Sequence, residues 1–269
     1  SSTASIQVQP YADAGQGAQY GPTVSLQISR NLESFSITGP TNVVYQSTYR
    51  YTVPSYPGIS YSWQLPNGWS GSSTSNYIDV TVGCGSGNIV ATMTGCNGPK
   101  TANLGVNQNI IAPGTTISGS NIACASGAQF TVPGLVAGTN ISWNASSNLT
   151  LSNASSNYCT YSANSDGEGW IEATINAPAC GTSVTLPRKN IWAGLPVINN
   201  ITGDDHVDTY GMATYTAIGL SNPGATYNWT VSPSGTVSPG GHIASVYFGG
   251  DGDYRVYVTA TNSCGASET

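Results

Sequence analysis

The stretch Ile59-Ser60-Tyr61-Ser62-Trp63 decides the fold, because two later stretches repeat its pattern. They are Asn140-Ile141-Ser142-Trp143 and Ala225-Thr226-Tyr227-Asn228-Trp229, and the three tryptophans lie 80 and then 86 residues apart. Each stretch alternates apolar and polar residues, which predicts a β-strand with one face in a core and the other in water. We therefore interpret the chain as a tandem array with one core anchor in each copy: Trp63, Trp143 and Trp229.

Three further kinds of marker recur in the same order in each copy. An Ile-polar-Gly phrase precedes each tryptophan by 26 to 28 residues. A strand-like phrase with an aromatic residue follows it, and a cysteine closes each copy, with 84 residues between successive cysteines. The markers are Ile37, Ile117 and Ile201, then Tyr51, Phe130 and Tyr215, then Cys96, Cys180 and Cys264. One order in three copies predicts a repeat of about 80 residues.

The composition indicates an all-β protein. Only 7% of the 269 residues are charged, and the chain contains 33 glycines and 16 tyrosines. No window offers the run of Ala, Leu, Glu and Lys that a surface helix needs. A repeat of about 80 residues fits one β-sandwich. We therefore predict an all-β fold of tandem β-sandwich domains in a row.

The charge balance argues against two classes of partner. The net charge is −6 and the chain has six Lys and Arg residues, so no basic stripe is available for nucleic acid or for an anionic membrane surface. No apolar run approaches the roughly 18 residues of a membrane span. We expect neither nucleic-acid binding nor membrane insertion.

Prolines between the copies set the predicted domain boundaries. Pro113 and Pro196 each follow the last strand-like segment of a copy, and proline interrupts a central ladder. The predicted domains are residues 1–33, 34–112, 113–194 and 195–269. In the first full repeat we expect strands near residues 36–37, 48–53, 60–64, 77–82, 88–94 and 101–106.

Both ends of the chain differ from the complete copies. Residues 5–9 and 23–28 alternate around a Gly-rich turn. We expect residues 1–33 to be the C-terminal hairpin of a preceding repeat; the alternative is a disordered leader. The third repeat stops five residues after Cys264, so its last strand is expected to be incomplete and to leave an open sheet edge. These features predict a natural polypeptide that is longer on each side.

The stretch from Trp63 to Ser73, Trp-Gln-Leu-Pro-Asn-Gly-Trp-Ser-Gly-Ser-Ser, and the later Cys96 carry a resemblance to a known family. They resemble the PKD-like and immunoglobulin-like repeats in large secreted proteins of Bacteroidetes. The second copy, with Gly169-Trp170-Ile171, resembles the same group, and residues 254–265 are similar to the final strands of ordinary PKD domains. The resemblance implies tandem immunoglobulin-like (PKD-like) sandwiches. Such modules occur in adhesins, in type IX secretion cargo and beside the catalytic domains of polysaccharide-degrading enzymes, so the domain type does not fix the task.

The function that these features favour is mechanical. We interpret the chain as a non-catalytic extracellular spacer or adhesive stalk segment of a large bacterial surface or secreted protein. Its two histidines, His206 and His242, have no recurring nucleophile and base beside them in the sequence, so we do not expect an enzyme. The expected partners are other repeats of the same longer chain, and surface glycans or proteins. Two alternatives stay open: a glycan-binding accessory segment of a secreted polysaccharide-degrading enzyme, and a filament subunit whose open edge accepts a neighbour's strand.

Trp69 is the best exposed candidate for a glycan contact. It lies beyond the turn Pro66-Asn67-Gly68 in a loop rich in Ser and Gly, which predicts exposure. For the other aromatic residues we favour cross-strand pairs on the sheet faces over a sugar-stacking platform. They are Tyr56, Tyr61, Tyr77, Trp170 and Tyr247.

An acidic run in the third repeat suggests a calcium site. Residues 204–208 include three aspartates, and the turn at residues 249–253 includes two more. In a sandwich these two turns lie at the same end, so Asp208, Asp251 and Asp253 are candidate oxygen ligands for calcium. The alternative is a solvated turn. No other cofactor is expected.

The six cysteines suggest disulfides in a secreted chain, but their connectivity cannot be deduced from sequence. They are Cys84, Cys96, Cys124, Cys159, Cys180 and Cys264. Bridges within one repeat would join Cys84 to Cys96 and Cys124 to Cys180. The first pairing is disfavoured, because a strand between the two cysteines would hold them roughly 20 Å apart. Cys264 has no partner in its own repeat, so it is either free or paired outside this chain.

Overall fold

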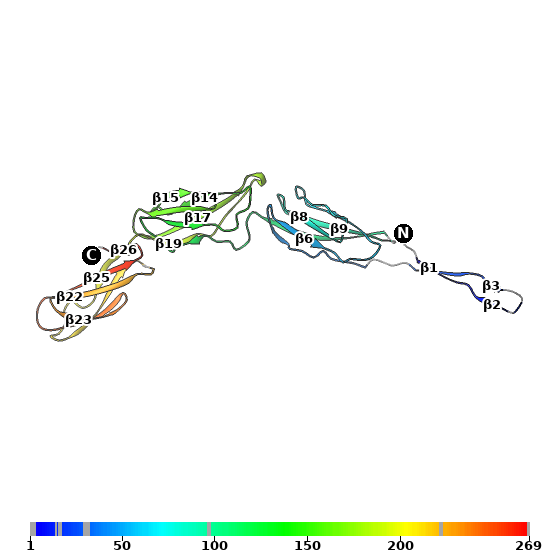
Figure 1. The fold of residues 1–269 in the computed structure, drawn as a ribbon. Helices are drawn as coiled ribbons and strands as arrows, with labels where there is room; N and C mark the ends of the chain where they lie inside the picture. The colour runs from blue at the N-terminus through cyan, green and yellow to red at the C-terminus, as the bar shows by residue number, and fades with distance from the viewer. Residues whose placement is uncertain are drawn as a thin grey trace. The chain divides into compact units, whose positions relative to one another are not determined.

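In the computed structural model of the chain, the regular secondary structure is almost entirely β-strand (Figure 1). The structure describes residues 4–13, 15, 18–28, 33–95, 98–220 and 223–267. Two compact units divide the chain, Ser1–Pro113 and Gly114–Thr269. Within the described residues the one helical segment is a single 3₁₀ turn, Pro178–Cys180, and no helix is long and apolar enough to cross a bilayer. The predicted all-β fold is confirmed.

The first repeat forms a sandwich of two sheets in the first unit. One sheet has the strand order β5-β10-β9-β7, and the other pairs β6 with β8. β5 runs parallel to β10, whereas the other pairs are antiparallel. The strands are β5 Asn42–Val44, β6 Thr48–Thr52, β7 Ser60–Gln64, β8 Tyr77–Thr81, β9 Gly87–Gly95 and β10 Gly98–Asn109. β6 to β10 lie where strands were expected and β5 was not expected. No strand forms at residues 36–37; the neighbouring Thr38 makes only an isolated bridge to Thr52.

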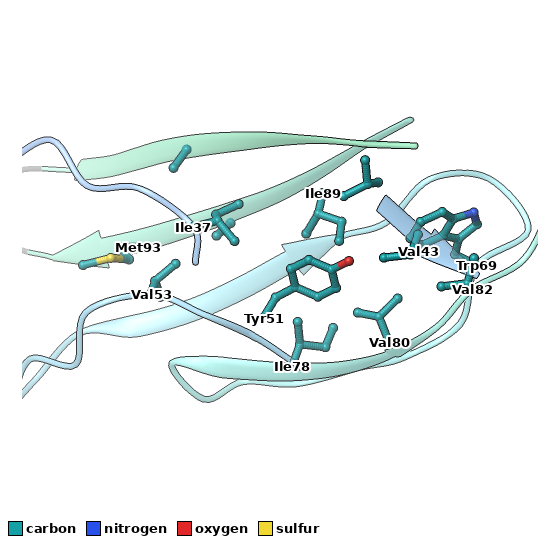
Figure 2. Close-up of a cluster of buried hydrophobic side chains, with 13 residues drawn as sticks. Ile37, Val43, Tyr51, Val53, Trp69, Ile78, Val80, Val82, Ile89 and Met93 are labelled. Atoms are coloured by element: carbon teal, nitrogen blue, oxygen red, sulfur yellow. The ribbon is translucent and has the colours of Figure 1, made fainter. Parts of the chain in front are cut away.

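The core of this sandwich lies between its two sheets (Figure 2). Alternate residues of β8 and β9 are buried, among them Ile78, Val80, Ile89 and Met93. Tyr51 from β6 is 0% exposed, and its hydroxyl donates a hydrogen bond to the Pro40 carbonyl at 3.0 Å. That bond matters, because a buried hydroxyl without a partner costs free energy.

The Ile-polar-Gly phrase and the aromatic strand phrase meet in space in all three repeats. In each, a Cβ atom added to the glycine would lie much closer to the ring's Cδ1 atom than van der Waals contact allows. The pairs are Gly39 with Tyr51 at 2.2 Å, Gly119 with Phe130 at 2.6 Å, and Gly203 with Tyr215 at 2.3 Å. The ring therefore packs against bare backbone, and the two sequence markers are the halves of one contact.

The second repeat is the larger sandwich of the second unit. Its two sheets have the orders β11-β13-β16-β15 and β12-β19-β17-β14, and β18 pairs with β17. β12 runs parallel to β19. The strands are β11 Ser118–Gly119, β12 Ile122–Ala123, β13 Ala128–Thr131, β14 Asn140–Ala145, β15 Leu149–Ala154, β16 Tyr158–Ala163, β17 Gly167–Ala177, β18 Thr182–Thr185 and β19 Lys189–Ala193.

The third repeat is a sandwich of the sheets β20-β21-β24-β23 and β22-β25-β26. Its core includes Trp229, Ala244 and Val258. The strands are β20 Ile198–Thr202, β21 Met212–Gly219, β22 Thr226–Ser232, β23 Gly235–Gly240, β24 Ile243–Phe248, β25 Arg255–Asn262 and β26 Gly265–Ala266.

The three expected anchors differ in burial. Trp229 is 5% exposed, and its Nε1 donates to the Gly241 carbonyl at 3.0 Å. Trp63 is half-buried against the first core, and its Nε1 donates to the Ser75 carbonyl at 3.0 Å. Trp143 is also half-buried, and its buried Nε1 has no hydrogen-bond partner among the described residues. Of the three, Trp229 alone is almost fully enclosed.

A separate hairpin precedes the first sandwich. β1 Ala4–Val8 pairs antiparallel with β4 Val24–Ile28, and β2 Tyr11–Asp13 pairs with β3 Ala18–Tyr20. β1 and β4 lie where the sequence predicts the two strand-like segments. That this hairpin belongs to a preceding repeat stays a prediction.

Candidate functional site at the junction of the second and third repeats

Trp69 is not the exposed aromatic residue that the sequence predicts. It is 8% exposed, packs in the core of the first repeat, and donates from Nε1 to the Gly85 carbonyl at 3.0 Å (Figure 2). The cause is the next residue, because Ser70 and Thr81 exchange two backbone hydrogen bonds that fasten the loop to β8. The expectation that Trp69 is available to a glycan is therefore wrong.

The acidic turns of the third repeat border a cleft of about 500 Å³. Asp251 and Asp253 line this cleft together with Asp204 and Asp205, whereas Asp208 is not among its lining residues. The Thr209 hydroxyl donates a hydrogen bond to Asp251. In the part of the chain that the structure describes, no three His, Cys, Asp or Glu side chains are placed to hold a metal ion. Asp208, Asp251 and Asp253 are thus not gathered into one calcium site.

The exposed pair of His206 and Asp205 supports the alternative that residues 204–208 form a solvated turn. His206 Nδ1 lies 3.1 Å from Asp205 Oδ1, and both side chains are almost fully exposed. The hydrogen bond with His206 lowers the pKa of the Asp205 carboxyl. An exposed pair of this kind contributes little to stability.

A groove of about 670 Å³ runs along β17 and β19 and reaches Pro223 of the third repeat. Trp170 lines it, half-buried, with the Arg188 guanidinium 3.7 Å from the centre of the indole ring. Arg188 Nε also donates to Glu172 Oε2 at 3.0 Å. The carboxylate and amides that line the same groove belong to Glu168, Asn121 and Asn190.

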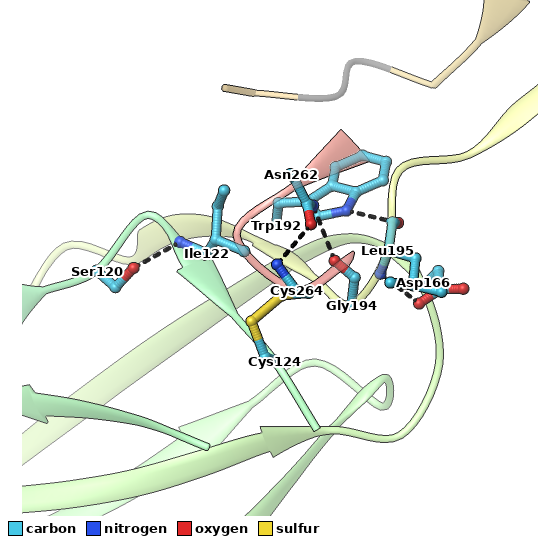
Figure 3. The surroundings of a disulfide bond; sticks show 9 residues. All are labelled: Ser120, Ile122, Cys124, Asp166, Trp192, Gly194, Leu195, Asn262 and Cys264. Atoms are coloured by element: carbon cyan, nitrogen blue, oxygen red, sulfur yellow. Dashed lines mark hydrogen bonds between the residues drawn. A yellow bond between two sulfur atoms is a disulfide. The ribbon is translucent and has the colours of Figure 1, made fainter. Parts of the chain in front are cut away.

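A disulfide joins Cys124 of the second repeat to Cys264 of the third, 140 residues later (Figure 3). Cys124 follows β12 directly, and Cys264 lies in the turn between β25 and β26. The two Cα atoms are 5.1 Å apart, within the ordinary range. The sequence interpretation is corrected here, since Cys124 does not pair with Cys180 and Cys264 has its partner inside this chain.

The remaining cysteines are of three kinds. Cys84 and Cys180 are also disulfide-bonded. Cys159 is a free, buried thiol, and burial raises its pKa to about 12. Cys96 lies outside the described residues. Disulfides indicate an oxidising, extracellular environment, consistent with a secreted or surface domain.

Hydrogen bonds surround the interrepeat disulfide (Figure 3). Asn262 donates from Nδ2 to the Gly194 carbonyl at 3.0 Å and accepts from the Cys264 amide at 2.8 Å. Trp192, 1% exposed, donates from Nε1 to the Leu195 carbonyl at 2.9 Å. The turn that contains Cys264 is thus held by Asn262, which also binds the segment that connects the two repeats, residues 194–195.

Asp166 fixes that connecting segment from the other side. Its Oδ1 accepts a hydrogen bond from the Leu195 amide at 2.7 Å. A Cβ atom at Gly194 would lie 1.9 Å from the same oxygen, and Gly194 has φ 73°, so glycine is needed here for both space and conformation. Together, the disulfide and these hydrogen bonds make the junction a built structure that can hold two sandwiches together. Sequence reasoning missed it because the disulfide and the hydrogen bonds Asn262–Gly194 and Asp166–Leu195 join residues of different repeats.

One repeat of the chain is similar to a known domain family. No curated protein matches the chain. Solved structures that are similar include murine CEACAM1b (15% identity, 59% of this chain and 98% of that chain, TM-score 0.26), the titin I9-I11 tandem (11%, 86% and 96%, 0.26) and the N-terminal four Ig domains of Dscam1 isoform 6.44 (9%, 85% and 74%, 0.26). Residues 31–106 match the family described as the PKD-like domain. With the sheets described above, the chain is a tandem of β-sandwich domains, and the first of them is similar to a PKD-like domain.

Proposed function

We propose that this chain is a non-catalytic extracellular spacer or adhesive stalk segment of a bacterial surface or secreted protein. The observation that carries the proposal is the junction of the second and third repeats. A spacer must hold its domains together while its ends are pulled or displaced. The Cys124–Cys264 disulfide does this covalently, and Asn262 and Asp166 restrain the same segment by hydrogen bonds.

The polar clusters favour this function over catalysis. His206 pairs with an exposed aspartate, and the ring of His242 lies 6.4 Å from that of Tyr227. Neither contact is the nucleophile, base and orienter arrangement that hydrolases use. The match of residues 31–106 to a PKD-like domain supports the same conclusion, by analogy.

A display experiment tests the spacer function. The chain is placed between a cell-surface anchor and a small binding reporter, and capture of large ligand-coated particles is measured. We expect better capture than with the reporter fused directly to the anchor, because the repeats raise it above the surface. An unrelated tandem of three β-sandwiches should substitute for the chain. Capture no better than with the direct fusion would overturn the proposal.

The groove beside Trp170 favours glycan binding as a second candidate function. Its lining includes an indole ring, over which Arg188 lies, with a carboxylate and two amides, and such groups bind sugar rings and hydroxyls. Tyr77 provides a matched control, since Arg50 lies over its ring at 4.5 Å and pairs with Asp79, but Tyr77 does not line this groove.

A polysaccharide array decides this second candidate. We expect binding that is lost in Trp170→Ala and kept in Tyr77→Ala. Absence of binding by the unmodified chain, or an equal loss of binding in both variants, would exclude this glycan site. The spacer function would then be the one remaining proposal.

A further inference from the structure

We propose that the Cys124–Cys264 disulfide is a covalent load path that carries tension past the folded cores of the second and third repeats. This inference rests on the proposed spacer function. It follows from the connectivity of one bond: the backbone enters the unit at Gly114, reaches Cys124 ten residues later, and crosses to Cys264 close to the last described residue, Ser267. Everything between the two cysteines lies in a closed loop.

Without this bond, tension would act on the strand pairing of the second repeat. β12 and β19 are parallel, with Ile122 opposite Trp192 and Ala123 opposite Ala193. Pulling on the start of β12 and on the end of β19 would shear this short ladder. Its backbone hydrogen bonds include Trp192 N to Asn121 O and Gly194 N to Ala123 O, each 2.8 Å.

With the bond closed, tension leaves β12 at Cys124, its very next residue, and does not continue into β19. The third repeat is relieved in the same way, because tension arrives at Cys264 in the turn after β25. Unfolding of either core would then lengthen only the short segments outside the loop, residues 114–123 and those after Cys264. A closed loop cannot be extended from outside.

The length withheld by the loop is large. The cysteines are 140 residues apart in sequence, and an extended chain spans at most 3.3 to 3.6 Å per residue. Opening the bond would therefore release roughly 460 to 500 Å of chain.

The test is single-molecule stretching of the full chain through handles at its two ends. In every arm Cys84, Cys96 and Cys180 are replaced by serine, so that no other disulfide constrains the length. We expect Cys264→Ser to increase the fully extended contour length by roughly 460 to 500 Å over the chain that keeps both cysteines. Cys124→Ser and the double variant should give the same gain, since each opens the same bond.

Cys159→Ala is the matched control, because it removes the buried free thiol of the second repeat and should leave the contour length unchanged. The fully extended length does not depend on how well a variant folds, so a destabilised variant still gives a decisive answer. Equal contour lengths with and without Cys264 would overturn the load path. Failure of the display experiment would instead remove the spacer function and leave this length difference intact, so the two failures are distinguishable.

Discussion

At the scale of single residues, three glycines determine how closely the aromatic rings approach the backbone. Gly39 lies against Tyr51, and the equivalent contact recurs in the other two repeats. The sequence shows these glycines and rings as separate markers about a dozen residues apart. Their shared spacing has one cause, since a ring against bare backbone leaves no room for a side chain.

Gly39→Ala should destabilise the first repeat by about 1 to 3 kcal/mol, because its methyl group would overlap the ring of Tyr51. Gly105→Ala in the same repeat is the control, since the nearest atom to its Cβ would be Asn88 Oδ1, at 3.6 Å. Denaturant unfolding that follows this repeat measures both. Equal destabilisation by the two variants would show that the ring contact is not the cause.

The tryptophans should respond unequally to the same substitution. Trp229→Phe removes a hydrogen bond and leaves the Gly241 carbonyl without that donor, whereas Trp143→Phe removes an indole N–H that has no partner among the described residues. We expect Trp229→Phe to cost about 1 kcal/mol more than Trp143→Phe. Native-state amide exchange in the core strands of each repeat gives the two values separately. A larger loss for Trp143→Phe would contradict this ranking.

At the scale of elements, the strands predicted with success are those with a regular apolar alternation. β7, β14 and β22, each containing a marker tryptophan, lie where the sequence places them. The short strands β5 and β12 were not predicted, because two or three residues are too few to show an alternation of apolar and polar side chains. Tertiary pairing with β10 and β19 creates them instead.

The same limit explains the candidate sites. Trp69 lies in a sequence typical of an exposed loop, and its burial depends on a bridge from Ser70 to Thr81 that local composition does not encode. The junction contacts of Cys264, Asp166 and Asn262 likewise join distant parts of the chain. Sequence identified the domain type and the cysteines but not the cysteine partners.

β16 should make the second repeat sensitive to alkaline pH. It contains Cys159 and Tyr161, whose pKa values burial raises from 9.0 and 10.0 to about 12. In the unfolded chain both groups lose their protons at lower pH, so ionisation above pH 9 favours the unfolded state. Stability should be level below pH 9 and fall as the pH rises towards 12. Chemical unfolding across this range measures the slope, which Cys159→Ala should reduce; an unchanged slope would exclude the thiol as a cause.

At the scale of the whole molecule, one covalent bond overrides the division into repeats. The second and third sandwiches have separate sheets, but Cys124 and Cys264 place them in one connected unit. Mutational effects in the two sandwiches are therefore expected to couple through the junction, whereas widely separated sites usually add.

Cutting the third repeat should not release its end. A protease site inserted at the exposed turn around Gly241, between β23 and β24, would separate Cys124 from Cys264 along the backbone. We expect a single band after cleavage on a non-reducing gel and two bands after reduction, because the disulfide still joins the pieces. The same insertion in Cys264→Ser should give two bands without a reductant. Two bands without reductant from the cleaved chain that keeps both cysteines would contradict the assigned pairing.

The Cys124–Cys264 bond also sets the unit by which such an array can be recombined. Exchanging the third repeat alone for a sandwich without the equivalent cysteine would leave Cys124 with a free thiol, and exchanging the second would do the same to Cys264. Unpaired thiols in an oxidising environment form disulfides with wrong partners. We expect duplication, shuffling or engineering of this segment to keep this bond only when the two sandwiches are inherited as a pair.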